Sequence, residues 1–323
     1  MNETAILFLT PLLVLVILAL FSFTGCTPFT AAEVPENPKT VPGPPLVVAP
    51  PDKPPPPVTL SYQDVVKATA GFAALWPLNE TGGNIASVVG SLSPAAQGVY
   101  NSKAPAPPGS GYKLGQNGVL FPKEAGDFAP EFDGTVAFVE VPFNAPLNPS
   151  KMAAGFTVEL WIKPNPAATA PQVVISSHRF DAPGSQQGYE IVLIKDPAQA
   201  HHQIRARVFG NIPGPTEAVV QPLQGDPAEW RHVLLIYEVM PATGPTLTLV
   251  VKLAKTANPY RNGPHTAAYE TVTSAKPSSL RFAAGHAATT QQPENFFAGR
   301  IDNIAFYNAV LPQSEIDKHF NMF

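Results

Sequence analysis

Glu131 and Asp133 are two carboxylates whose spacing could support glycoside hydrolysis. A retaining hydrolase uses two carboxyl groups about 5 Å apart, one as nucleophile and one as acid/base. Alternate residues of a strand face one side, so a strand that supplies such groups would read Glu-x-Asp-x-(x)-Glu. The last carboxylate of that pattern is missing, because Thr135 and Val136 stand in its place. We therefore expect Glu131 and Asp133 to be ordinary strand residues.

The sequence also lacks a second carboxylate beside Glu159, a nucleophile elbow and a histidine pair spaced to bind one metal ion, although the spacing leaves a Ser-His-Asp triad open. Glu159 has no carboxylate partner on its face of the strand predicted for residues 155–164, and no Gly-x-Ser-x-Gly nucleophile elbow occurs. His201 and His202 are adjacent, so they would point to opposite faces of a strand and could not easily share one metal ion. We expect both to be exposed turn residues, and we expect His232 to pack and hydrogen-bond inside a strand. The sequence thus predicts that the protein is not an enzyme.

Aromatic and arginine side chains in the loops are candidates for ligand binding. An aromatic ring offers a ligand a flat apolar face, and a guanidinium group offers five N–H donors. The candidates are two adjacent pairs and one separate tyrosine: Arg179, Phe180, Tyr189, Tyr260 and Arg261. The alternative is that these rings anchor loops and cover the rim of the core.

The composition excludes several classes of protein. The chain has 39 prolines in 323 residues, and proline is poorly tolerated inside helices and central strands, so a helical bundle or a doubly wound α/β fold is not expected. The net charge of −4 argues against nucleic-acid binding, which depends on positive charge. Cys26 is the single cysteine, so the chain cannot form an internal disulfide or a thiolate metal cluster.

Residues 1–25 are expected to form a signal peptide or a membrane anchor. Residues 5–23 are almost uninterruptedly apolar, as in the hydrophobic region of an export signal. The Phe-Thr-Gly run before Cys26 is similar to the lipobox of bacterial lipoproteins, in which the cysteine receives lipid. The first four residues contain no lysine or arginine, which leaves an uncleaved anchor helix as the alternative. Both alternatives attach the chain to a membrane and place the remainder outside the cytoplasm.

Residues 26–59 are expected to be a linker that begins with the lipidated cysteine. Twelve of the 30 residues from 28 to 57 are proline, and no hydrophobic period is present there. Such a segment favours an extended polyproline conformation with a rise of about 3.1 Å per residue. We expect it to act as a spacer between the membrane and the globular domain.

In the rest of the chain, apolar and polar residues alternate as in β-strands, and turns rich in glycine, proline and asparagine separate these segments. In residues 155–164, apolar side chains recur at every second position from Phe156, while Glu159 would share the opposite face with Trp161. Two short helices are expected, at residues 62–68 and 313–320. This pattern predicts an antiparallel sandwich.

Several motifs resemble those of laminin-G-like, concanavalin A-like jelly-roll domains. They include Phe-Thr-Val-Glu-Leu-Trp-Ile-Lys-Pro in the middle and Gly-Arg-Ile-Asp-Asn near the end. The matching segments follow the order of the family, at residues 62–66, 72–83, 132–141, 156–164, 230–233 and 297–316. The resemblance implies an all-β, concanavalin A-like antiparallel jelly-roll β-sandwich over residues 60–323.

The same resemblance implies a structural calcium ion. In similar domains this ion often lies where the opening strand meets the C-terminal strand, and the matching positions are Glu80, Asp133 and Asp302. Calcium prefers carboxylate and carbonyl oxygens. An aspartate common in the family is replaced by Ser87. The alternative is that Asp302 and Asn303 are turn or ladder residues whose side chains bind backbone N–H groups.

Together these features predict a non-catalytic, membrane-tethered recognition module in a bacterial cell envelope, facing the periplasm or the exterior. Its partner would be a glycan or another envelope protein. The alternatives are a glycan-active hydrolase of the same fold and a scaffold in a surface assembly without a small-molecule site. The functional part of this expectation comes from the fold, and one fold hosts many functions.

Overall fold

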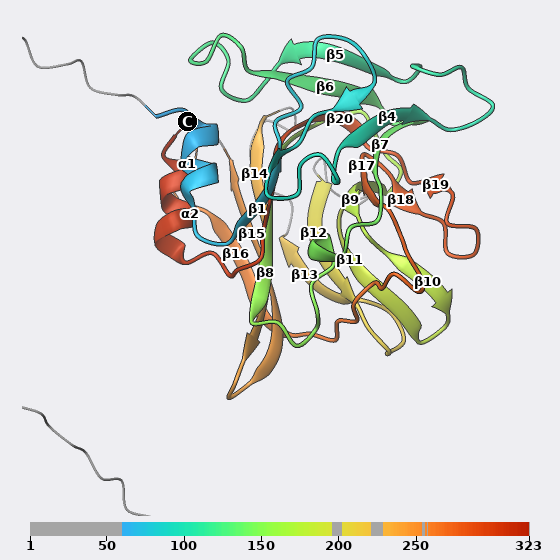
Figure 1. Ribbon diagram of the computed structural model, residues 1–323, viewed down its shortest axis with the longest axis vertical. Helices are drawn as coiled ribbons and strands as arrows, with labels where there is room; N and C mark the ends of the chain where they lie inside the picture. The colour runs from blue at the N-terminus through green and yellow to red at the C-terminus, as the bar shows by residue number, and fades with distance from the viewer. Residues whose placement is uncertain (1–59, 196–201, 221–228, 254–255, 257, 323) are drawn as a thin grey trace, which may run out of the picture. The chain divides into compact units, whose positions relative to one another are not determined.

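The computed structural model describes residues 60–195, 202–220, 229–253, 256 and 258–322, and Figure 1 shows how their helices and strands are arranged. Two antiparallel sheets dominate the structure, and two short helices, α1 (Tyr62–Ala68) and α2 (Gln313–Phe320), accompany them. The predicted all-β sandwich with two short helices is confirmed. The predicted signal segment 1–25 and linker 26–59, which include Cys26, lie outside the described residues.

The first sheet is built around the strand whose alternation is clearest in the sequence, β8. Its main path runs β16-β15-β14-β8-β20-β1-β3, and β6 joins it through β20 and carries β5. The strands are β1 (Phe72–Trp76), β3 (Val89–Gly90), β5 (Tyr112–Asn117), β6 (Phe128–Asp133), β8 (Gly155–Pro164), β14 (Arg231–Met240), β15 (Gly244–Leu253), β16 (Tyr260–Thr266) and β20 (Ala298–Tyr307).

The second sheet runs β13-β12-β11-β9-β17-β7-β4-β2, with β10 paired to β11. Its strands are β2 (Ile85–Ala86), β4 (Gly98–Ser102), β7 (Ala137–Val141), β9 (Gln172–Ser176), β10 (Arg179–Ala182), β11 (Ser185–Lys195), β12 (His202–Phe209), β13 (Thr216–Val220) and β17 (Leu280–Phe282). A separate two-stranded ladder of β18 (Gly285–His286) and β19 (Pro293–Glu294) lies beside β9. A 3-10 turn, η1 (Ala145–Leu147), follows β7.

The core lies between the two sheets and follows the alternation of the strands. On β8, the predicted apolar face packs into this core, with Phe156 tilted against Tyr189 of the second sheet at a ring-centroid distance of 5.2 Å. Trp76 is also fully buried there, and its indole N–H donates to the backbone oxygen of Ala96 at 2.9 Å. Large aromatic side chains therefore join the sheets, as expected for a sandwich whose inner faces interdigitate.

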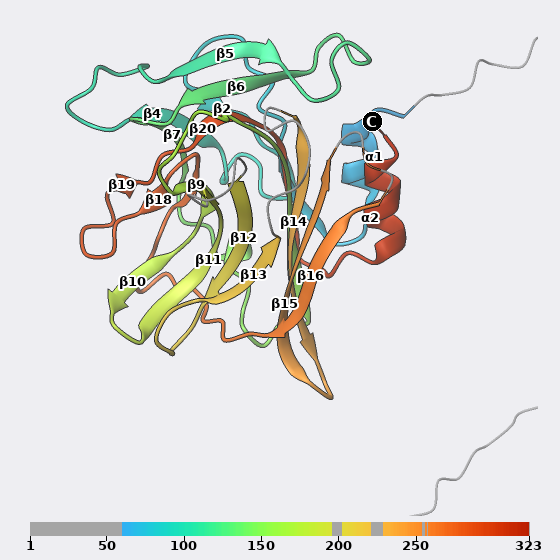
Figure 2. The same cartoon turned by 180° about the vertical axis from the view of Figure 1, so that it is seen from behind.

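The opposite face of β8 is covered by the two helices, which lie side by side against the first sheet (Figure 2). Glu159 is fully buried under them and accepts hydrogen bonds from His232 Nε2 at 2.6 Å and from the hydroxyl of Tyr307 at 2.9 Å. Tyr62 of α1 donates to the same carboxylate at 2.8 Å, and His319 of α2 lies 2.9 Å from it. A single carboxylate thus holds both helices to the sheet.

Two expectations about histidines are resolved by these strands. His232 packs and hydrogen-bonds inside β14, as predicted. His202 is not an exposed turn residue: it opens β12, is buried, and has Nε2 3.0 Å from the backbone oxygen of Ala168. The prediction was wrong because β12 already starts at this residue, so His202 belongs to the sheet and not to the preceding turn. His201 lies outside the described residues. In the described part of the chain, no helix has the length and apolar character needed to cross a membrane.

Candidate functional site

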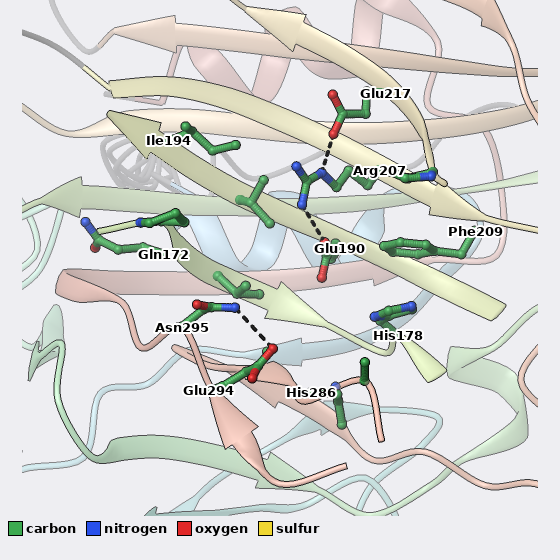
Figure 3. Close-up of a pocket in the computed structure, with 16 residues that line it drawn as sticks. Gln172, His178, Glu190, Ile194, Arg207, Phe209, Glu217, His286, Glu294 and Asn295 are labelled. Atoms are coloured by element: carbon green, nitrogen blue, oxygen red, sulfur yellow. Dashed lines mark hydrogen bonds and ion pairs between the residues drawn. The ribbon is translucent and has the colours of Figure 1, made fainter. Parts of the chain in front are cut away.

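A cavity of about 450 Å³ opens on the outer face of the second sheet (Figure 3). The alternation of β11 places one charged and two apolar side chains on this face: Ile191 and Leu193 point into the core, so Glu190, Val192 and Ile194 point outward. Strands β9, β11, β12 and β13 form the floor, and the β18–β19 ladder forms one wall. The cavity is thus built from strands rather than from loops alone.

An arginine and two glutamates cross the floor of the cavity. Arg207 on β12 donates from Nε to Glu217 at 2.6 Å and from Nη1 to Glu190 at 3.1 Å. Arg205 holds the second oxygen of Glu217 at 2.9 Å. Side chains two residues apart on β12 therefore fix carboxylates of β11 and β13, which flank it in the sheet.

Glu190 has an environment that differs from that of Glu217. It is almost fully buried, and burial raises the pKa of its carboxyl group although Arg207 acts in the opposite direction. Its second oxygen lies 3.5 Å from Ser176 Oγ. Burial therefore favours the protonated form of the Glu190 carboxyl group.

An aromatic pair lines another part of the cavity. His178 stacks on Phe209, with ring centroids 3.7 Å apart and an interplanar angle of 18°. Burial lowers the pKa of His178 to about 4, and burial also lowers the pKa of His286 well below its usual value. Both imidazoles are thus neutral near pH 7. The site offers flat ring surface, neutral hydrogen-bonding groups and fixed charges, which is the mixture that ligand pockets commonly combine.

Ser176 and His286 form a pair that resembles part of a nucleophilic dyad. Ser176 Oγ lies 3.3 Å from His286 Nδ1 and accepts from the backbone N–H of His178 at 3.1 Å. The serine is fully buried, however, so a substrate in the cavity cannot reach its oxygen. We interpret the pair as a hydrogen-bonded support for the floor of the cavity.

The ligand residues predicted from the sequence do not come together in the structure. Tyr189 is fully buried in the sandwich core, because it lies on the inward face of β11, and this overturns its assignment to a ligand-binding loop. Arg179 and Phe180 lie on β10, where Arg179 pairs with Asp181 at 2.9 Å. These two residues do not line the cavity.

The other predicted pair belongs to a different sheet. Tyr260 and Arg261 lie on β16, the edge strand of the first sheet. Tyr260 is 42% exposed, and Arg261 donates to Gln313 of α2 at 2.9 Å. A different pattern in the sequence could have indicated the cavity. Arg205 and Arg207 stand at alternate positions of β12, and a glutamate follows on the next strand.

The three acidic residues proposed for calcium have separate partners. Glu80 accepts from the backbone N–H of Ser87 at 2.7 Å and from the hydroxyl of Tyr100 at 3.0 Å. Asp133 accepts from the backbone N–H of Thr135 at 2.8 Å. Among the described residues, no group of three or more histidine, cysteine, aspartate or glutamate side chains is placed to hold a metal ion. The trio of Glu80, Asp133 and Asp302 is therefore not a metal centre.

Asp302 instead lies beside Asp127, which the sequence did not single out. Burial raises the pKa of Asp127 to about 6, and burial together with the charge of Asp127 raises the pKa of Asp302. Asp302 Oδ2 accepts from the backbone N–H of Val119 at 2.8 Å. A Cβ atom at Gly118 would collide with both carboxylates, so only glycine leaves them room.

Asn303 completes a set of oxygen atoms that fits a hard cation. Its Nδ2 donates to Asp302 Oδ1 at 2.8 Å, while its own buried Oδ1 has no hydrogen-bond partner. Rotation of the amide by half a turn would place this oxygen beside both carboxylates. Calcium binds such neutral and charged oxygens, so Asp127, Asp302 and Asn303 are the residues that would hold it. The ion would supply charge neutralisation between β20 and the loop that carries Asp127.

Comparisons with known proteins agree with the fold. A laminin G family model, described as the concanavalin A-like lectin/glucanases superfamily, matches residues 133–317, more than half of the chain. No match is found among curated protein sequences.

Three of the similar solved structures are the following, each at most 12% identical to this chain. Domain 4 of a GH43 extracellular arabinanase from Geobacillus stearothermophilus, in complex with arabinotriose, is 12% identical with a TM-score of 0.49, over 77% of this chain and 98% of that one. The binding domain of botulinum neurotoxin DC in complex with SialylT is 11% identical with a TM-score of 0.45, and the match covers 76% of this chain and 52% of that one. This chain thus spans about half the length of the neurotoxin binding domain. The enzymatically active domain of a bacteriophage CBA120 tailspike protein is 10% identical with a TM-score of 0.48, and the match covers 69% of this chain and 30% of that one.

Proposed function

Because the chain belongs to the concanavalin A-like lectin/glucanases superfamily, we propose that it is a non-catalytic recognition module that binds carbohydrate in the cavity of the second sheet. The observation that carries this proposal is the combination of ring surface and fixed polar groups in one cavity of about 450 Å³. Sugars present apolar C–H faces and hydroxyl groups, so a site for them needs both kinds of surface.

The side chains of the cavity have distinct tasks in this proposal. The ring of His178, backed by Phe209, faces the apolar side of a sugar ring. The carboxylates of Glu190 and Glu217 accept hydrogen bonds from hydroxyl groups. Arg207 keeps both carboxylates in place, which fixes their orientation before the ligand arrives.

The place of action in this proposal is a bacterial cell envelope. Residues 1–25 would direct export or serve as an anchor, Cys26 would carry the lipid, and the proline-rich segment would hold the domain away from the membrane. The domain would then face the periplasm or the exterior, where glycans and other envelope proteins are available as partners. Mass analysis of the mature N-terminus tests this part, because an unmodified Met1 contradicts both cleavage and lipidation.

Binding can be tested with an array of glycans and with an extract of envelope proteins, using the full chain. We expect selective glycan binding, and we expect His178→Ala to weaken it at least tenfold by removing the ring surface. Tyr260→Ala is the matched control, since it removes an exposed ring from the edge of the other sheet. Loss of binding with Tyr260→Ala and retention with His178→Ala would contradict the proposed site, as would binding to an envelope protein alone.

A glycan hydrolase is the second candidate, and one observation favours it. Burial raises the pKa of Glu190, as a general acid requires, and Arg207 connects this carboxyl group to the second carboxylate, Glu217. In this alternative, glycans that bind would also release reducing ends, and Glu190→Gln would abolish the release. The proposed non-catalytic function expects no release from the unaltered chain.

A further inference from the structure

The charges around the cavity are unevenly distributed. Three carboxylates line it, those of Glu190, Glu217 and Glu294. Among the described residues that line the cavity, Arg207 is the only lysine or arginine. Two of the donors of Arg207 are already engaged by Glu190 and Glu217. The two lining histidines are neutral near pH 7, because burial lowers their pKa values. Arg205, which also pairs with Glu217, and Arg207 balance two of the three carboxylates, so the excess negative charge of the cavity lies at Glu294.

Glu294 is the carboxylate that is least compensated. It belongs to β19 and lies across the cavity from Glu217 (Figure 3). Its Oε1 accepts from the amide of the neighbouring Asn295 at 3.3 Å, and among the described residues it forms no ion pair with a lysine or arginine. Its side chain is half-buried, so water screens its charge only in part. A cationic group of a ligand can thus pair with Glu294 without displacing a lysine or arginine from it.

We infer that the cavity selects a hexosamine whose amino group is free, with the ammonium group beside Glu294 and the sugar ring against His178. This inference rests on the proposed function, because it names the class of sugar for the same cavity. An ammonium group is a donor that forms short, charge-assisted hydrogen bonds to carboxylates. An acidic sugar would instead meet three carboxylates and an arginine whose charge is already paired with two of them. Neutral sugars would bind without the charge-assisted contact.

The test is calorimetric titration of the full chain at low salt with three tetrasaccharides. The probes are β-1,4-linked glucosamine, its N-acetylated counterpart and an oligogalacturonate. We expect the glucosamine tetramer to bind about tenfold more tightly than the N-acetylated one, which corresponds to about 1.4 kcal/mol, and we expect no binding of the acidic probe. The preference should diminish at high salt because it is coulombic.

Glu294→Gln removes the charge and keeps the shape of the side chain. We expect this variant to lose the preference, so that the glucosamine tetramer and its N-acetylated counterpart bind with equal affinity. Glu238→Gln, on β14 of the other sheet, is the matched control and should retain the preference.

Each outcome has one meaning. If the N-acetylated tetramer binds as tightly as the glucosamine tetramer, or if Glu294→Gln retains the preference, the inference is wrong while the proposed function stands. If no saccharide of any charge binds to the chain in the wider array, the proposed function fails. If an oligolysine peptide binds as tightly as the glucosamine tetramer and also depends on Glu294, the ligand is a peptide amine and the inference is overturned.

Discussion

Arg207 Nη1 lies 3.1 Å from Glu190 Oε1, so a largely buried carboxylate on the outer face of the second sheet receives its counter-charge from the neighbouring strand. The same guanidinium reaches Glu217 on the strand beyond it. A buried pair of this kind contributes little net stability when it replaces apolar packing, but it does fix the positions of its members. On the floor of the cavity, the pair therefore fixes the carboxylates that we propose to bind the ligand.

Replacement of Glu159 by alanine should strongly destabilise the fold. The carboxylate is fully buried and receives hydrogen bonds from both sheet and helices, so its loss leaves several buried donors without an acceptor. We expect the free energy of unfolding in urea to fall by about 3 to 5 kcal/mol. Glu238→Gln is a suitable control and should change it by less than about 0.5 kcal/mol. An equal, small effect of both variants would show that the helices are held by apolar packing alone.

The same carboxylate predicts the acid stability of the protein. Burial by itself would raise the pKa of Glu159, but the charges and hydrogen bonds of His232 and His319 outweigh burial and hold the pKa well below its usual value. A lowered pKa in the folded state stabilises the fold above about pH 4.5, and this contribution is lost as the pH falls through the folded-state pKa. Unfolding free energies measured from pH 7 downward should therefore fall more steeply for the unaltered chain than for Glu159→Gln. Parallel curves would disprove the assignment.

Calcium should stabilise the protein through Asp127 and Asp302. The raised pKa of Asp127, about 6, means that stability present at low pH is lost as the pH rises through that value when no cation is bound. A cation between the carboxylates would restore this stability, by about 2.7 kcal/mol at a concentration 100 times its Kd. We expect the Tm at pH 7 to rise with added CaCl2 and to fall with chelator.

Asp302→Asn provides the control for the cation site. It removes one charge from the pair and keeps the shape, so the Tm should no longer respond to calcium, while the Tm without calcium should be equal to or higher than that of the unaltered chain. A calcium-dependent Tm that persists in this variant would place the ion elsewhere.

Tyr189 should behave as a core residue. Its ring packs against Phe156, and its hydroxyl donates to the backbone oxygen of Leu147 at 3.0 Å. We expect Tyr189→Ala to lower the free energy of unfolding by about 3 to 5 kcal/mol, as large aromatic truncations in cores do. Tyr189→Phe should lose only the hydrogen bond, about 1 kcal/mol. If Tyr189→Ala folds with unchanged stability, the ring of Tyr189 does not lie in the core and β11 pairs in a different register.

Local periodicity explains what could be predicted of the fold. The alternation of β8 correctly separated Phe156, which faces the core, from Glu159 and Trp161, which face the helices. The two helices begin and end at the expected residues, 62–68 and 313–320. These features depend on neighbouring residues, whose side-chain directions are set by the backbone of one element.

The candidate site could not be predicted in the same way, because it depends on pairing between strands. Arg207 meets Glu190 and Glu217 only because β11, β12 and β13 are adjacent and in register, and register is not readable from one strand. Asp127 was overlooked for a similar reason: it lies in a proline- and glycine-rich segment and meets Asp302, which is far away along the chain. Long-range contacts of this kind need the tertiary structure.

Amide hydrogen exchange with and without a bound oligosaccharide tests the central claim most directly. The readout maps the bound region without any substitution and does not depend on the sugar's charge. We predict that the ligand slows exchange in β11, β12, β13 and the β18–β19 ladder, which surround the cavity. Slower exchange confined to β16 at the edge of the first sheet, or to the surface of the helices, would contradict the assignment of the cavity as the carbohydrate site.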